Sequence, residues 1–139
     1  MIALCRDFEV STKGHTDIND ITSRVEQIVS DEGLKEGLAT VFTPGATASI
    51  STIEYESGAV SDLREAVRRL APEDVNYRHD ARWGDGNGFS HVRASLLGPS
   101  LSVPIADGRM TLGTWQQIVF VDFDNRSRSR SLMIQFMGE

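Results

Sequence analysis

The sequence predicts a single α+β domain over residues 1–139, in which a largely antiparallel sheet or sandwich carries two to three helices. The chain length falls in the commonest single-domain range, and no repeat or linker interrupts it. Apolar residues make up 40% and charged residues 24%, which are ordinary globular values and too apolar for a disordered chain. Segments with a strand period alternate irregularly with helical ones, unlike the regular strand–helix array of a parallel sheet.

Each element is predicted from its hydrophobic period and from the residues that end it. A helix is expected where apolar residues recur every three or four positions, and a strand where β-branched residues are dense. Asp17–Asp20 resembles an N-terminal cap for the first helix, Gly33 ends that helix, and Pro72 ends the second. The expected strands of the first half are 5–12, 38–42 and 47–55, and the expected helices are 18–29 and 60–70.

The second half is predicted to be mostly β after a central segment without a clear period. Phe89–Leu97 is a short helical pattern closed by Gly98. Gln117–Asp124 has apolar residues on both faces, which indicates a central strand. We expect it to form a hairpin with Leu132–Met137 across Asn125–Arg130, and the last strand to offer an apolar edge that an oligomer would cover. The other expected strands are 101–105 and 110–112.

The charge balance and the N-terminus narrow the classes of partner and compartment. Twenty acidic against fourteen basic side chains give a net charge of −6, which disfavours nucleic acid as a partner. No stretch approaches the ~20 apolar residues of a membrane span, so no membrane partner is expected. The N-terminus has no leader-like run, and we expect the cytoplasm. Cys5 is the only cysteine, which excludes an internal disulfide and a Cys-based zinc knuckle.

The densest polar segment, His79–His91, is the predicted functional site. Its glycines alternate just before a helix, and such a turn presents unpaired backbone N–H groups to an anion. We therefore expect phosphate binding at Gly86, Asn87 and Gly88, with Arg93 nearby. A plain glycine-rich loop that only caps the helix explains the same pattern, and neither the P-loop nor the Rossmann spacing is present.

His79 and His91 flank this segment and are candidate metal ligands or acid–base groups. Asp80, Asp85 and Glu54 are the candidate carboxylate companions; we place Asp85 in the metal set and Glu54 among the catalytic groups. Two imidazoles with a carboxylate and water suit zinc with an open position, and magnesium is the other divalent ion considered. The competing interpretation is that His91 packs in the helix while His79 bonds to the backbone.

Two further features are interpreted as structural. Trp115 is expected in the core, because tryptophan is usually highly buried. Arg128 and Arg130, in an alternation of serine and arginine, are expected to form a polar arm between two strands.

The chain carries five ordered motifs: Gly84–Ser100, Val103–Arg109, Leu112–Ile118, Thr43–Ala48 and Ile53–Glu56. Together they resemble the secondary thiamine-phosphate synthase family of YjbQ-like proteins, and the resemblance runs nearly end to end. It implies an α+β sandwich-like domain, a homotrimer and, in some members, a metal ion near the histidines. It also implies a weak ability to join a pyrimidine diphosphate to a thiazole phosphate.

The sequence departs from the commonest pattern of that family at three positions. Gly45, Ala48 and Phe89 stand where many members have His, Cys and His. A mechanism that needs a thiol or three imidazoles is therefore excluded. Two functions stay open: a metal-assisted enzyme acting on a small phosphorylated metabolite, and a non-catalytic trimeric module that binds an anionic metabolite or a metal ion.

Overall fold

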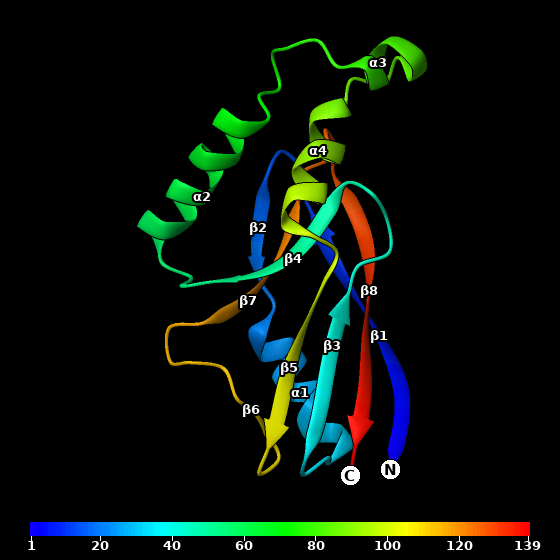
Figure 1. Cartoon of the computed structure of the whole chain (residues 1–139), viewed down its shortest axis with the longest axis vertical. Helices are drawn as coiled ribbons and strands as arrows, with labels where there is room; N and C mark the ends of the chain where they lie inside the picture. Colours follow the sequence, from blue (N-terminus) through cyan, green and yellow to red (C-terminus); the bar gives the residue numbers. More distant parts are fainter.

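Two antiparallel sheets form the body of the molecule. The larger sheet contains β1 (Ile2–Thr12), β8 (Arg128–Gly138), β3 (Gly37–Phe42), β5 (Ser100–Ala106) and β6 (Arg109–Met110), and the smaller contains β2 (Asp17–Asp20), β7 (Gln117–Asp122) and β4 (Ala48–Ile53). The computed structural model describes all 139 residues and arranges these strands in the orders β1-β8-β3-β5-β6 and β2-β7-β4 (Figure 1). Every neighbouring pair is antiparallel, so the expected α+β class is confirmed.

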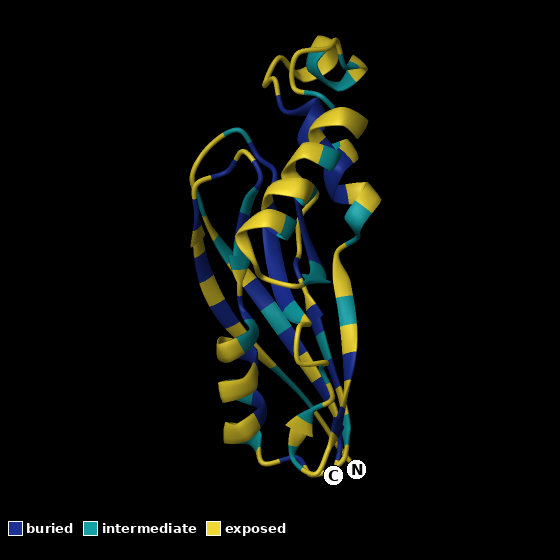
Figure 2. Ribbon diagram, turned by 90° about the vertical axis from the view of Figure 1, so that its left-hand side faces the viewer, coloured by how far each residue is buried: buried dark blue, intermediate teal, exposed yellow.

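The main core lies between the two sheets and is built by alternating residues. In β3, Ala39 and Val41 are fully buried, whereas Leu38 and Phe42 are 37% and 39% exposed. Figure 2 shows the same alternation as dark-blue and yellow bands along the long strands. Val41 shares one buried cluster with Phe120 of the smaller sheet. This pattern fixes the register, because a slip of one residue would turn every core side chain of a strand outward.

The smaller sheet is buried on both faces. Helices α2 (Ser57–Leu70) and α4 (Gly88–Leu97) cover the face that turns away from the larger sheet. Val121 of β7 shares a buried cluster there with Val67 of α2 and Ala94 of α4. The prediction that this segment is a central strand is confirmed.

Helix α1 (Thr22–Glu32) begins later than the sequence indicates. Asp17–Asp20 forms strand β2 beside β7, so the prediction that it caps the helix is wrong; pairing with β7 outweighs the local cap signal. Only Asp20 still helps the helix, by accepting the Thr22 N–H at 2.9 Å. Helix α3 (Arg78–Trp83) was not predicted, and the chain has four helices rather than two to three. None of the four is long and apolar enough to cross a membrane.

The predicted hairpin between β7 and β8 does not form. The two strands are consecutive but lie in different sheets, and β8 pairs on both sides, with β1 and β3. By crossing to the larger sheet, β8 buries Leu132, Ile134 and Phe136 completely, so it is an interior strand and not the predicted edge. Trp115 is 72% exposed on the loop between β6 and β7, which corrects its expected place in the core.

Candidate functional site

A glycine turn between α3 and α4 brings the two ends of the predicted site together. Gly84 ends α3 in the left-handed region at φ 71°, and its N–H donates to the Asp80 carbonyl at 2.8 Å. Gly86 is also left-handed, at φ 70°. Such angles are costly for residues with a Cβ, so glycine permits this sharp reversal. Figure 1 shows the result, with α3 folded over the start of α4 at one end of the molecule.

The His79 imidazole lies between two carboxylates. Its Nδ1 is 3.3 Å from Asp80 Oδ1 and 3.4 Å from Asp85 Oδ1, and the ligand atoms of the three groups all lie within 4.8 Å of one another. The His79 and Asp80 side chains are 28% exposed and that of Asp85 is 50% exposed, so solvent reaches the cluster. A single N–H on Nδ1 cannot satisfy both carboxylates fully. Asp80 has a second donor in the Gly88 N–H, but Asp85 has none, so the negative charge of Asp85 is available to a cation.

His91 contacts His79 but stands outside this set of three. The ring centroids are 4.3 Å apart, with planes tilted by 40°. Two imidazoles bound to one tetrahedral zinc hold their centroids about 5 Å apart, from the Zn–N bond length. A shared ion would therefore require a small rotation of one ring. His91 also lines a cavity of about 270 Å³ with Gly45, Ala48 and Pro99, so two of the three departures from the family pattern lie beside it. Phe89, the third departure, is buried instead.

The glycine loop offers fewer free amides than its sequence indicates. The Gly88 N–H already donates to Asp80 Oδ1 at 2.8 Å, so Asp80 occupies the start of α4. A Cβ at Gly88 would lie 2.6 Å from that of Tyr77, which explains the glycine by close packing. Asn87 is 8% exposed and turns inward: its Nδ2 donates to Asp124 Oδ1 at 3.2 Å, while its Oδ1 has no partner.

Arg93 does not reach the glycine amides. It lies two residues after His91, and positions two apart on a helix face different directions. Its Nε donates to the Ala71 carbonyl at 2.9 Å and its Nη1 to Thr16 Oγ1 at 2.8 Å. The structure thus separates Arg93 from the phosphate set predicted for Gly86, Asn87 and Gly88.

Glu54 lies far from the histidines within one chain. Ala48, in the His91 cavity, begins β4, and Glu54 follows the other end of that strand, about 20 Å away at ~3.3 Å per residue. There it lines a different cavity with Trp115. The next acid, Glu56, caps α2 by accepting the N–H groups of Gly58 and Ala59, and these bonds lower its pKa.

The loop of the candidate site is hydrogen-bonded to a buried network of two aspartates and two arginines. The sequence did not predict this network. Asp122 and Asp124 are completely buried. Arg130 donates to both oxygens of Asp122 at 2.8 and 3.0 Å, and Arg128 donates twice to Asp124 at 3.0 and 2.6 Å. The two aspartates are two positions apart in the sequence, and so are the two arginines. In extended chain this spacing places each pair on one face, and it is the signal from which the pairing could have been predicted. The two arginines are ion-pair partners and not a free polar arm.

This network fixes the charge state of Asp124 and holds the loop. Burial alone would raise the pKa of Asp124, but hydrogen bonds from Asn87, the Asn125 N–H and Arg128 outweigh it and lower that pKa to about 2. Asn125 also donates from Nδ2 to the Asp85 carbonyl at 2.9 Å. The loop that carries Asp85 is thus tied at two points to the buried carboxylates.

Solved structures share this fold along nearly the whole chain. A structure from Sulfolobus solfataricus, described as a YbjQ-like protein of unknown function, is 30% identical with a TM-score of 0.93 and covers 99% of both chains. A hypothetical protein from Aeropyrum pernix K1 is 32% identical, with a TM-score of 0.90, over 98% of this chain and 99% of that one. The likeness therefore includes the whole fold.

Related sequences are also similar to this chain over nearly its whole length. A UPF0047 protein of Archaeoglobus fulgidus is 36% identical over 93% of this chain and 98% of its own length. The UPF0047 protein YugU of Bacillus subtilis is 32% identical over 97% of this chain and all of its own. The family model described as UPF0047 protein YjbQ-like matches residues 6–139, and the chain therefore belongs to the UPF0047 family of YjbQ-like proteins.

Proposed function

We propose that the cluster of His79, Asp80 and Asp85 binds a divalent cation, zinc in preference to magnesium, next to a site for a small phosphorylated metabolite. The observation that carries the proposal is the convergence of three ligand atoms within 4.8 Å. Bonds of 2.0–2.1 Å at tetrahedral angles place neighbouring ligand atoms about 3.3–3.4 Å apart. The Nδ1–Oδ1 distances of 3.3 and 3.4 Å match this spacing. Magnesium prefers oxygen ligands in an octahedron, which this set suits less well.

The residues of the cluster have separable roles in this proposal. His79, Asp80 and Asp85 hold the cation, and a fourth position stays open to His91 or to an oxygen of the metabolite. When bound, a divalent cation neutralises the charge that develops on a phosphate leaving group. His91 faces the neighbouring cavity, where an imidazole can donate or accept the proton of a reacting group.

The proposed assembly is a homotrimer, as the family resemblance implies. The outer face of the larger sheet carries two apolar cross-strand pairs, Leu38 with Met137 and Phe42 with Met133, on either side of the polar pair Thr40 and Gln135. Leu38, Phe42 and Met137 are 37%, 39% and 50% exposed, and contact with a second copy would cover them. In such a trimer, Glu54 could join the catalytic groups only from a neighbouring subunit.

A second function is supported by the cavity beside His91. Gly45, Ala46 and Ala48 contribute no acid, base or nucleophile to it. A trimeric module that binds the metal or an anionic metabolite without turnover fits this lining. The thiamine-phosphate-synthase-like condensation is the reaction with which to distinguish the two functions.

Metal content tests the proposal directly. Purified protein dialysed against micromolar zinc should retain about one zinc per chain by mass spectrometry of the metal, and His79→Ala should retain almost none. Asp62→Asn, an exposed acid on α2, is the matched surface control and should keep the full content. Wild-type protein without zinc would refute the site.

Turnover then separates the enzyme from the module. A true ligand present at 100 times its Kd stabilises the fold by about 2.7 kcal/mol, so thermal shift ranks candidate phosphate esters first. Release of pyrophosphate from a pyrimidine diphosphate and a thiazole phosphate, lost in His79→Ala, supports the enzyme. Stabilisation without any turnover supports the module.

A further inference from the structure

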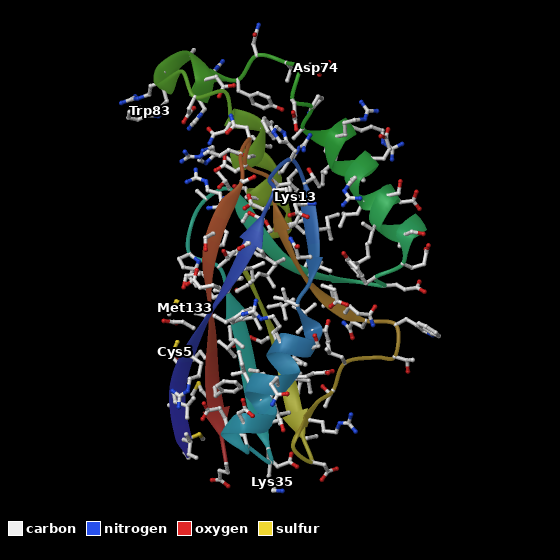
Figure 3. The ribbon with its side chains drawn as sticks, turned by 180° about the vertical axis from the view of Figure 1, so that it is seen from behind. Cys5, Lys13, Lys35, Asp74, Trp83 and Met133 are labelled. Atoms are coloured by element: carbon white, nitrogen blue, oxygen red, sulfur yellow. The ribbon has the colours of Figure 1, made fainter.

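Another cavity, of about 350 Å³, is lined only by polar and charged residues. It lies between the end of α2, the turn after β1 and the face of α4 that turns away from His91. Figure 3 labels Asp74, which lines it, and Lys13 at the start of that turn. Arg64, Arg68 and Arg93 line it against two acids, so the lining is net positive although the whole chain carries −6. Its volume is within the range of small-molecule sites.

Arg93 brings a buried positive charge to this cavity without a close counter-ion. It is 3% exposed, and its nearest carboxylate oxygen, Glu73 Oε1, is 3.8 Å from Nη1. Charge-assisted pairs are usually 2.7–2.9 Å long, as Arg130 and Asp122 are at 2.8 Å. A buried ion without such a partner is costly. Burial accordingly lowers the pKa of Arg93. The remaining contacts of its guanidinium are two neutral oxygens and the face of the Phe89 ring at 4.9 Å.

A strained turn presents two more groups to the same cavity. Gly14, His15 and Thr16 are all left-handed, at φ 77°, 52° and 64°. A β-branched residue in this region is a genuine outlier, and such conformations concentrate at functional sites. The turn is held by Arg93 at Thr16 Oγ1 and by Arg64, whose Nε donates to the Thr16 carbonyl at 3.1 Å. The two terminal nitrogens of Arg64 are left for a ligand.

The Glu73 carboxylate lies between His15 and Arg93, in the position that an anionic ligand would take. Its Oε1 lies 3.3 Å from His15 Nδ1 and 3.8 Å from Arg93 Nη1, too far for strong bonds to either. Its side chain is 42% exposed and free to swing into solvent. An incoming anion with shorter bonds would therefore displace it.

We propose that this cavity binds the phosphate group of a small phosphomonoester, with Arg64, Arg93 and His15 as its donors. These donors come from a helix, a second helix and a turn, and approach from three directions. That arrangement suits a tetrahedral dianion better than a planar carboxylate, which one guanidinium fork can satisfy alone. The site lies apart from the metal cluster and needs no cation.

Titration with inorganic phosphate tests this site on the full-length protein, with EDTA present to remove any metal contribution. Calorimetry should show saturable binding in the millimolar range or tighter. Arg64→Gln should weaken it at least about tenfold, because one charge-assisted interaction is lost. Glu73→Gln should tighten it about threefold or more, because the competing charge is removed. Arg69→Gln, on the same helix but outside the lining, should change it less than twofold.

The opposite changes in phosphate affinity expected for Arg64→Gln and Glu73→Gln distinguish a ligand site from structural ion pairing. Far-UV circular dichroism checks that both variants fold. Non-saturating titration of the wild-type protein would overturn the proposal, as would equal losses in Arg64→Gln and Arg69→Gln. Weaker or unchanged binding in Glu73→Gln would also overturn it. Tighter binding of succinate than of phosphate would refute the ligand class.

Discussion

The two charged clusters at the α3–α4 end of the molecule differ in how their charges are balanced. In the buried network, Asp122 and Asp124 each face an arginine at 2.6–2.8 Å. In the solvent-reached cluster, two carboxylates share one imidazole, His79, at 3.3–3.4 Å. The first arrangement satisfies its charges internally and stabilises the fold. In the second, Asp80 also accepts the Gly88 N–H, whereas the Asp85 carboxylate faces only His79, so its negative charge is not fully compensated. The proposed cation site requires such a charge.

The balanced cluster also positions the unbalanced one. Asn87 bonds the buried Asp124, and the half-buried Asn125 bonds the carbonyl of Asp85, so both ends of the Asp85–Asn87 segment are held by hydrogen bonds. Metal sites depend on such supporting bonds, whose loss commonly weakens binding 10- to 100-fold. Because its Nδ2 is occupied by Asp124, Asn87 serves the proposed cation site as a positioning residue.

The largest effect is expected where a buried charge loses its partner. Arg130→Ala leaves the Asp122 carboxylate in the interior without a cation, with only two neutral donors, the Thr12 hydroxyl at 2.6 Å and the Asp124 N–H at 3.0 Å. Breaking a buried pair costs about 3–5 kcal/mol. We expect a loss of at least about 3 kcal/mol in the free energy of unfolding, measured with urea. Arg126→Ala, an exposed arginine of the same connection, is the control and should change it by less than about 0.5 kcal/mol.

A smaller effect is expected from protonation of Asp124. Its pKa is about 2 in the fold against 3.8 for a free aspartate, so the group stabilises the fold above about pH 4. That contribution, about 2 kcal/mol, is lost as the pH falls through 2. The advantage of wild type over Asp124→Asn in the free energy of unfolding should shrink by this amount between pH 5 and pH 1.5. A carboxyl carbon that titrates near pH 4 by NMR would contradict the pairing.

The sequence predicts the layers of this fold better than it predicts which charges meet. Hydrophobic period identified β7 as a central strand, because burial on both faces is a local pattern. It could not show that β8 leaves β7 for the other sheet, since that choice depends on packing across the whole core. The convergence of His79 and Asp85 was predictable from a short glycine turn. The separation of Arg93 from His91 also follows from helical geometry, once the helix is accepted.

The smallest effect on stability is expected at Asp85, where the effect on binding should be large. The Asp85 side chain is 50% exposed, and the bond that holds the loop uses its backbone carbonyl. Asp85→Asn keeps both the side-chain shape and that bond, so the free energy of unfolding should change by less than about 0.5 kcal/mol. The variant replaces an anionic ligand by a neutral amide. We therefore expect zinc affinity to fall at least about tenfold, which corresponds to about 1.4 kcal/mol.

Competition with a zinc-chelating dye measures the affinity of Asp85→Asn, and urea unfolding in EDTA measures its stability without metal. Asp62→Asn, with the same change of charge on the surface of α2, should alter neither quantity and so excludes a general electrostatic effect. If Asp85→Asn lowers the free energy of unfolding by over 1 kcal/mol while zinc affinity is unchanged, the cluster is structural, like the buried network of Asp122 and Asp124. The contrast between the two clusters would then fail, because both would serve only to hold the fold.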